Sequence, residues 1–345
     1  MDFLIVRLGS IGDIVHALPM AEALRARHPE AGIDWLVERA LAPVVRLSPA
    51  VTRVVTIETR RLRQGRGWLP VLRELRARGY DMAFDAQGLV KSAALARLSG
   101  ARRVVGWTGA HVREAPAAWC STERVDPGSG RHVIDKNLAL LRAAGIEDAP
   151  RTMRLDEGPP SPHLDAWVSG RQGPYAIVNP GGNWPNKRWP PDRFGEVAAW
   201  LRDRFGLYSI VLWGPGDEPL ADAVVAASDG AAQRAPATSL ADLVALTRRA
   251  SLMISGDTGP IHFACAVGTP VVGVYGPTDP GRNGPWRAED VCVSRFEACA
   301  CHHQRTCRAA RWCLLDVDVE QVKAAVARRL SIARAGERRE GPASP

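Results

Sequence analysis

Short apolar runs alternate with longer amphipathic segments along the first hundred residues. The runs that read as strands lie at 2–6, 33–38, 51–57 and 80–88. The segments with helical spacing of apolar positions lie at 19–29, 68–79 and 89–100. Strands that alternate with helices predict a parallel sheet that is covered on both faces.

The alternation is interrupted between about residues 107 and 170 and then resumes. A Pro/Gly/Ser-rich stretch at 156–167 reads as a linker. The expected segments of strand and turn after it lie at 175–182, 208–218 and 251–259, and the last expected strand lies at 270–280. The expected helices lie at 191–206, 239–250, 260–268 and 319–335. In the second of them, Ser239 and Asp242 have the spacing of a capping box.

The pattern predicts an α/β protein with two Rossmann-like domains that face each other across a cleft. The expected boundaries are 1–165 for the first domain, 172–318 for the second, 319–335 for a C-terminal helix and 336–345 for a disordered tail. Ligands of open α/β sheets bind at the carboxyl ends of the strands, so we look there for chemistry.

Chain length, apolar runs and net charge each limit the class of protein. The 345 residues suit two domains. No apolar run reaches the ~18–20 residues of a membrane span, and the N-terminus lacks the features of a secretory signal, so we expect a cytoplasmic protein. The net charge of +8 reflects either the base composition of the genome or attraction to an anionic partner such as phosphate, anionic lipid or nucleic acid.

The segment 254–266 carries the clearest signal for a ligand. A strand ends in a Gly-containing turn, and Pro260 suits the first turn of the following helix. The free N–H groups of such a helix start bind anions, Thr258 can add a hydroxyl donor, and His262 lies one turn further on. A carboxylate at Asp257 would repel a phosphate, so Asp257 either caps the helix or binds a sugar hydroxyl.

Two further Gly-containing turns follow strands in the second half. At 179–190, Gly182 and Asn183 let the backbone approach a ligand, and Lys187 could neutralise a phosphate leaving group. The alternative for Lys187 is a solvated loop position. Glu218, after the turn at 213–217, could accept hydrogen bonds from ribose hydroxyls.

The opening segment 4–19 ends its first strand in a turn and an acid. Gly9 and Gly12 permit a tight turn, and Asp13 follows at the start of a helix. Spacing alone favours a simple helix-start acid. The functional alternative is a general base that is ionised at neutral pH and takes a proton from an alcohol.

Several of these segments together resemble one enzyme family. The stretches "LIVRLGSIGDIVHALP", "DAQGLVKSA", "NPGGNWPNKRWP", "SGDTGPIHFACA" and "VYGPTDP" are similar to those of the lipopolysaccharide heptosyltransferases of glycosyltransferase family 9. The resemblance extends over nearly the whole chain and is strongest to the heptosyltransferase I type.

The resemblance implies a fold and a reaction. The fold is GT-B, and the reaction transfers L-glycero-D-manno-heptose from ADP-heptose to Kdo of the lipopolysaccharide inner core, with inversion and without a metal or cofactor. It implies Asp13 as the catalytic base and Lys187 as a second catalytic residue, at the donor phosphates. The implied donor-binding residues are Gly182, Asn183, Glu218, Asp257, Thr258, Gly259 and His262.

The acceptor, Kdo-lipid A, is an anionic glycolipid, so basic residues are candidates to bind it. The implied acceptor-binding residues are Ser10, Gly12, Arg60, Arg61, Arg63, Lys91 and Arg113. The alternative for the arginines is a solvated basic loop. We expect a monomer with peripheral contact to the inner membrane, and no nucleic-acid partner, because no basic face is interleaved with aromatic residues.

Four of the seven cysteines fall in a short segment and depart from the heptosyltransferase I pattern. These are Cys299, Cys301, Cys307 and Cys313, with His302 and His303 between them. Their spacing is not a repeated Cys-x-x-Cys, so we expect a loop near the domain interface with reduced or partly paired thiols, and structural zinc is the weaker alternative. The departure leaves heptosyltransferase II or another family 9 transferase as an alternative, with a non-catalytic nucleotide-binding protein behind it.

Overall fold

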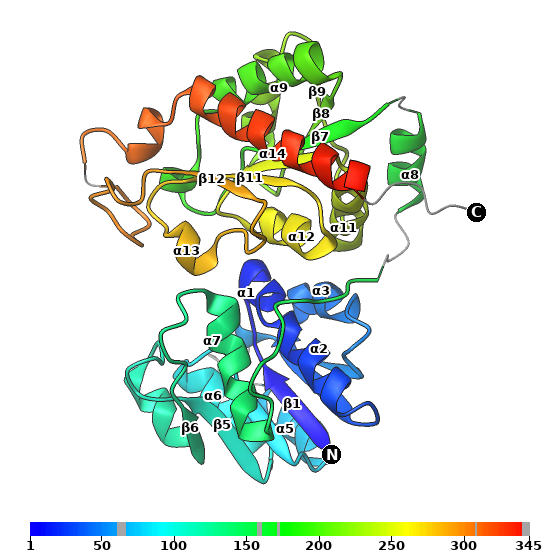
Figure 1. The fold of residues 1–345 in the computed structure, drawn as a ribbon. Coiled ribbons are helices and arrows are strands. Elements are labelled where there is room, and N and C mark those ends of the chain that lie inside the picture. The colour runs from blue at the N-terminus through cyan, green and yellow to red at the C-terminus, as the bar shows by residue number, and fades with distance from the viewer. Residues whose placement is uncertain (61–66, 157–160, 171–172, 308, 340–345) are drawn as a thin grey trace. The chain divides into compact units, whose positions relative to one another are not determined.

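The computed structural model describes residues 1–60, 67–156, 161–170, 173–307 and 309–339. The chain divides into two compact units, Met1–Asp156 and Glu157–Pro345 (Figure 1). The division falls within the linker expected at 156–167, ahead of the boundary expected at 165. Helix α8 (Pro162–Ser169), which spans residue 165, belongs to the second unit.

The first unit is built on a six-stranded sheet in the order β3-β2-β1-β4-β5-β6, and every neighbouring pair is parallel. The strands are β1 (Asp2–Val6), β2 (Gly32–Glu38), β3 (Arg53–Ile57), β4 (Met82–Asp85), β5 (Arg103–Trp107) and β6 (Glu123–Val125). The helices described in this unit are α1 (Ile11–Val15), α2 (Leu18–Arg27), α3 (Ala42–Arg46), α5 (Trp68–Arg76), α6 (Val90–Leu98) and α7 (Val133–Ala139). The 3-10 helices described in the same unit are η1 (Arg39–Leu41), η2 (Ala115–Cys120) and η3 (Leu140–Ala144).

Strand β1 is apolar at consecutive positions because it lies in the middle of a sheet with side chains buried on both faces. Leu4 and Val6 belong to one core cluster with Leu75 of α5 and Leu95 of α6. Phe3 lies on the other side of the strand, with its ring centroid 5.3 Å from that of His28.

The second unit repeats the same topology. Its sheet has the order β12-β11-β10-β7-β8-β9 and is also entirely parallel. The strands are β7 (Tyr175–Asn179), β8 (Tyr208–Val211), β9 (Ala232–Arg234), β10 (Leu252–Gly256), β11 (Val271–Tyr275) and β12 (Val291–Ser294). Besides α8, its helices are α9 (Pro191–Phe205), α10 (Glu218–Ala226), α11 (Leu240–Arg249), α12 (Gly259–Val267), α13 (Pro280–Asn283) and α14 (Val319–Arg339), with η4 (Pro185–Lys187) and η5 (Cys313–Asp316).

The core of the second unit joins α9 and α14 to one face of this sheet. Val178, Ile254 and Val272 from three neighbouring strands pack in one cluster with Leu201 of α9 and Val326 of α14. At α11, Ser239 accepts a hydrogen bond from the Asp242 N–H and Asp242 accepts one from the Ser239 N–H, which confirms the predicted capping box.

Both sheets have the strand order of a dinucleotide-binding fold, which confirms the expected α/β class with two Rossmann-like sheets. In each unit the order reverses at the central pair of strands, β1 and β4 in the first and β7 and β10 in the second. The crevice at the carboxyl ends of such a pair is the usual ligand site of this fold. The candidate residues are therefore expected near the carboxyl ends of these two pairs of strands.

The sequence analysis missed strands at or next to the sheet edges. Strands β5, β6, β9 and β12 were not predicted, and β12 follows the run that was taken as the last strand. Edge strands β6 and β12 are short and only partly buried, so neither has the run of fully buried positions seen in a central strand such as β10. Helix α14 also continues to Arg339, past the predicted end at 335, and residues 340–345 lie outside the described residues.

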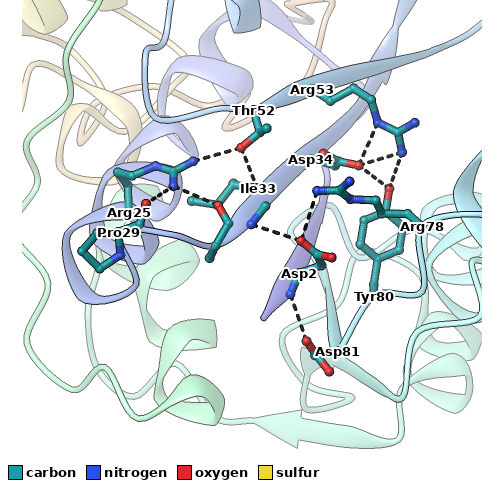
Figure 2. A network of polar contacts seen from close by, with 12 residues as sticks. Asp2, Arg25, Pro29, Ile33, Asp34, Thr52, Arg53, Arg78, Tyr80 and Asp81 are labelled. Carbon is teal, nitrogen blue, oxygen red and sulfur yellow. Dashed lines mark hydrogen bonds and ion pairs between the residues drawn. The ribbon is translucent and has the colours of Figure 1, made fainter.

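A polar network ties the starting ends of the first unit's strands together (Figure 2). The carboxylate of Asp34 lies 2.8 Å from the Arg53 guanidinium and accepts a hydrogen bond of 2.7 Å from the Tyr80 hydroxyl. Asp2 accepts a hydrogen bond of 3.1 Å from the Gly32 N–H and pairs with Arg78 at 3.2 Å. These contacts lie toward the amino ends of the strands, away from the ligand edge, so we assign them to stability.

Candidate functional site

The first candidate cluster surrounds Asp13, in the short helix α1 that follows β1. Its carboxylate lies 2.7 Å from Nη2 of Arg7 and 3.5 Å from Nη2 of Arg113. It also accepts hydrogen bonds from the Ser10 N–H at 3.1 Å and the Ser10 hydroxyl at 3.3 Å. Asp13 therefore lies at the start of a helix and at the centre of a cationic cluster. Its position fits both alternatives from the sequence, a helix-start acid and a general base.

Two cations keep Asp13 ionised. Burial by itself raises the pKa of Asp13, but the charges of Arg7 and Arg113 and the Ser10 N–H outweigh it, and the net pKa is lowered. Only 20% of the Asp13 side chain is exposed. The group is thus an anion with a fixed orientation at neutral pH, as a general base requires.

The motif "DAQG" forms the scaffold next to this cluster, at the end of β4. The buried Asp85 accepts hydrogen bonds from the N–H groups of Gln87 at 3.1 Å and Gly88 at 3.2 Å. Gln87 accepts a hydrogen bond of 2.8 Å from the Leu8 N–H, and the Gly88 carbonyl accepts one of 2.9 Å from the Arg113 N–H. The motif therefore links the loop after β1 to the segment that carries Arg113.

Glycine is required at position 88 for two reasons. Its φ of +68° lies in the left-handed region, and an added Cβ would lie 3.2 Å from the Arg113 backbone nitrogen. A side chain here would push away the segment that brings Arg113 to Asp13.

The other predicted acceptor residues lie at different places in the first unit. Ser10 and Gly12 flank the Asp13 cluster, whereas Lys91 lines an open cavity of about 420 Å³ together with Trp68, Leu89, Val90, Ala94 and Glu114. Arg60 is exposed, and Arg61 and Arg63 lie outside the described residues. Among the predicted acceptor cations that the structure describes, Arg113 is the one in contact with Asp13.

The second candidate cluster lies in the second unit, where β7 and β10 end. Nζ of Lys187 is 2.5 Å from Oδ2 of Asp257, and the Asn283 amide donates a hydrogen bond of 2.8 Å to Oδ1. Nε2 of the buried His262 is 3.8 Å from Oδ1 of Asp257. Burial would raise the pKa of Asp257, but His262 and Lys187 outweigh it and hold the pKa far below its usual range. At this distance, the His262 imidazole faces the carboxylate of Asp257.

Hydrogen bonds and glycines join the two turns of this cluster. The Asn179 amide donates hydrogen bonds of 2.9 Å to the hydroxyls of Ser255 and Thr258. Thr258 is the residue before α12, which begins at Gly259. An added Cβ at Gly256 would lie 2.9 Å from the Lys187 carbonyl oxygen. The loop between β7 and α9 (residues 180–190), here called the donor loop after its predicted role, can thus run against the end of β10 only because Gly256 has no side chain.

The remaining residues predicted to bind the donor follow the ends of neighbouring strands of the same sheet. Arg188 donates a hydrogen bond of 2.8 Å to the Gly182 carbonyl and pairs with Asp217 at 3.1 Å. Asn183 is exposed, and Glu218, the first residue of α10, accepts a hydrogen bond of 2.8 Å from the Gly216 N–H. The structure thus pairs Lys187 with Asp257, directly before Thr258 at the start of α12. Gly182 is held by Arg188, and Glu218 lies at the turn after β8.

Several functional contacts were missed from the sequence. Arg7 is the clearest, because a charged residue directly after an apolar strand run is an anomaly that signals a buried ion pair. Trp184 places its ring 4.2 Å from Nζ of Lys187. Asn283 and the Arg188–Asp217 pair carried no signal in the sequence, because they depend on contacts between distant segments.

The cysteines are free thiols. The sulfur atoms of the buried pair Cys299 and Cys301 are 3.5 Å apart. Within the described residues, no group of three or more His, Cys, Asp or Glu side chains is arranged to hold a metal ion. A search of the same residues finds no helix that is both long and apolar enough to cross a membrane.

The chain is similar to known glycosyltransferases in sequence and in fold. Residues 68–313 match the family described as glycosyltransferase family 9 (heptosyltransferase). Lipopolysaccharide heptosyltransferase 1 of Pseudomonas aeruginosa is 31% identical over 316 residues, which cover 89% of this chain and 87% of that protein. The protein of the same name from Escherichia coli K12 is 28% identical over 93% of this chain and 98% of its own length.

Solved structures agree with the sequence comparison. E. coli heptosyltransferase WaaC with ADP has a TM-score of 0.78 at 25% identity, covering 95% of this chain and 100% of that one. E. coli heptosyltransferase II has a TM-score of 0.77 at 22% identity, covering 97% and 100%, which is a likeness of fold. The chain therefore belongs to glycosyltransferase family 9 and is a lipopolysaccharide heptosyltransferase with the GT-B fold.

Proposed function

We propose that this protein transfers L-glycero-D-manno-heptose from ADP-heptose to Kdo of the lipopolysaccharide inner core, with inversion and without a metal. Two relatives, 31% and 28% identical over most of the chain, carry the name lipopolysaccharide heptosyltransferase 1. The WaaC structure with ADP-2-deoxy-2-fluoro heptose, at 26% identity and a TM-score of 0.74, supports the donor.

The observation that carries the proposal is the Asp13 carboxylate, which two arginines and Ser10 hold as an anion at the carboxyl end of β1. Asp13 takes the proton of the attacking Kdo hydroxyl. The hydroxyl oxygen forms a bond to the anomeric carbon of heptose from the face opposite ADP, and the bond to the diphosphate breaks. A single displacement of this kind inverts the anomeric centre.

The donor residues belong to the second cluster. Lys187 and the first N–H groups of α12, with Thr258 and Gly259, stabilise the charge that develops on the departing ADP. Asp257 already neutralises Lys187, so its carboxylate acts as an acceptor for a heptose hydroxyl rather than as a phosphate contact. Its partner His262 completes this side of the donor site.

Three further residues complete the donor site. Gly182 and Asn183 line the donor loop. Glu218 accepts hydrogen bonds from the ribose of ADP. These roles follow from their places in the turns after β7 and β8.

The acceptor site lies in the first unit. Ser10, Gly12 and Arg113 adjoin the base, and the cavity beside Lys91 offers an amphipathic surface with an indole and an ammonium group. We assign Arg60, Arg61 and Arg63 to the carboxylates and phosphates of Kdo-lipid A. The enzyme would work as a monomer in the cytoplasm, in peripheral contact with the inner membrane.

The test is ADP release by the purified protein with ADP-heptose and Kdo-lipid A in the presence of EDTA. A parallel reaction uses an acceptor that already carries one heptose. Turnover on Kdo-lipid A supports the proposal in full. Turnover only on the heptosylated acceptor would assign the protein to the second transfer, the alternative suggested by its four-cysteine segment. Activity that EDTA abolishes would contradict the metal-independent mechanism.

A further inference from the structure

The segment Cys299–Cys313, here called the cysteine segment, is attached to the donor loop of its own unit. The Asn186 amide, which is 4% exposed, donates a hydrogen bond of 2.9 Å to the Gln304 carbonyl and lies 3.8 Å from Sγ of Cys301. The His303 N–H donates a hydrogen bond of 2.8 Å to the Pro277 carbonyl in the loop after β11. Asn186 directly precedes Lys187 in η4, so the segment adjoins the lysine at the donor phosphates.

Internal contacts give this segment a defined shape, although its described residues between β12 and η5 form no helix or strand. Cys299 and Cys301 are buried, and the Cys301 N–H donates to Sγ of Cys299 at 3.4 Å. The rings of Phe296 and His302 stack with centroids 4.2 Å apart. The buried sulfurs thus anchor a turn whose next residues, up to 306, are exposed.

Arg305 extends from this turn toward the donor loop. Its guanidinium carbon lies 5.9 Å from the ring centroid of Trp184, and Nζ of Lys187 lies 4.2 Å from the same centroid. One indole ring therefore has two cations beside it. Arg305 is exposed, and it has no carboxylate partner in the parts of the chain that the structure describes.

The two cations of the donor loop itself, Lys187 and Arg188, are already paired with carboxylates. Lys187 is 2.5 Å from Asp257, and Arg188 is 3.1 Å from Asp217. Each pair is electrically neutral overall. A nucleotide sugar carries a negative charge on each of its phosphates, and the departing diphosphate gains one more. Because these pairs add no net positive charge, Lys187 and the start of α12 compensate the diphosphate charge only in part. Among the described residues, Arg305 is an unpaired cation beside the same ring.

We propose that Arg305 binds the diphosphate of the nucleotide sugar and stabilises it as it leaves, and that the cysteine segment serves to present it. A guanidinium suits this task because it donates two parallel hydrogen bonds to phosphate oxygens. The inference deepens the proposed function and rests on its donor. It gives the four-cysteine segment a role in donor binding.

The test measures ADP and adenosine binding by calorimetry, with no acceptor present, for wild type, Arg305→Ala, Arg305→Lys and Arg311→Ala. Arg311 is the matched control, because it is exposed in the same segment but pairs with Asp316 at 3.0 Å. We expect Arg305→Ala to weaken ADP binding about tenfold, a size typical of one charge-assisted hydrogen bond. Arg305→Lys should lose less, Arg311→Ala should match wild type, and adenosine binding should be equal in all four.

Three results would overturn the inference. They are an ADP affinity of Arg305→Ala within twofold of wild type, an equal loss in Arg311→Ala, or an equal loss of adenosine binding in Arg305→Ala. Failure of the proposed donor looks different, because wild type itself would then not bind ADP, and the inference would fall with it. Failure of the proposed acceptor alone would leave ADP binding by wild type and by the Arg305 variants unchanged.

A second variant tests the presenting role of the segment. Asn186→Ala removes the hydrogen bond to Gln304, so part of its effect on ADP binding should act through Arg305. The loss in Asn186→Ala/Arg305→Ala should therefore be smaller than the product of the two single losses. Fully multiplicative losses would show that Arg305 is placed independently of Asn186.

Discussion

The guanidinium of Arg7 lies 2.7 Å from the carboxylate of Asp13, although only 2% of the Arg7 side chain is exposed. Arg7 also donates a hydrogen bond to the carbonyl of Ala86, directly after β4. A buried arginine needs such partners, because an unpaired charge in the interior is costly. The orientation of Asp13 is therefore set by the junction of β1 and β4, the point where the strand order reverses.

Removing the Asp13 carboxylate should abolish catalysis and leave the donor site intact. We expect Asp13→Ala and Asp13→Asn to lower kcat by about 10²–10⁴-fold, the usual contribution of a general base. The Kd for ADP should be unchanged, because the donor residues belong to the second unit. ADP release and calorimetry measure the two quantities. The exposed Asp148→Ala in the same unit is the control and should retain full turnover. Substantial turnover by Asp13→Ala would refute the assignment.

The pH dependence of turnover should report the arginines around Asp13. Their positive charges lower the pKa of Asp13 against the effect of burial, so removing one of them raises that pKa. The base then becomes protonated at a higher pH. We expect the acid limb of the kcat/KM profile to move to higher pH in Arg113→Gln, and to return toward the wild-type position in Arg113→Lys. An acid limb that is the same in all three proteins would mean that it does not report Asp13.

The central strands and the turns after them could be predicted from the sequence for a physical reason. A strand that is buried on both faces is a continuous apolar run, and the glycines and acids that follow it mark the ligand edge. Asp13, Lys187 and Asp257 were singled out at such turns, and the roles predicted for them came from the family resemblance. An apolar run and the turn residues after it stand at consecutive positions, so a single sequence contains this signal.

The contacts of these residues could not be predicted, because they join segments that are far apart in the chain. Asn283 binds Asp257 across 26 positions, and Gln304 binds Asn186 across 118. The edge strands β6 and β12 were missed because they are short and partly exposed, so their hydrophobic signal is weak. The cysteines suggested a loop with its own chemistry, and only the fold places that loop beside Lys187.

The cavity beside Lys91 should contribute to acceptor affinity. Lys91 is followed on α6 by the exposed Arg97, which supplies a matched control of the same charge on the same helix. We expect Lys91→Ala to raise the KM for Kdo-lipid A several-fold while the KM for ADP-heptose stays constant, and Arg97→Ala to change neither. Steady-state kinetics with each substrate varied in turn give both constants. A rise in the donor KM, or equal effects of the two variants, would place the acceptor elsewhere.

The Lys187–Asp257 pair should make part of the stability of the second unit depend on pH. Asp257 has a pKa far below its unfolded value of 3.8, so it contributes stability that is fully present above that value and is lost as the pH falls through the folded pKa. Asp257→Asn lacks this contribution and should be less stable by about 1–3 kcal/mol near neutral pH, since a buried charged hydrogen bond is lost. The difference from wild type should shrink below about pH 4, where the unfolded carboxyl is protonated. Urea unfolding of both proteins at several pH values between neutral and acid measures this difference. A deficit that stays constant down to the acid end would show that the loss comes from packing and that the ionised carboxylate contributes no stability.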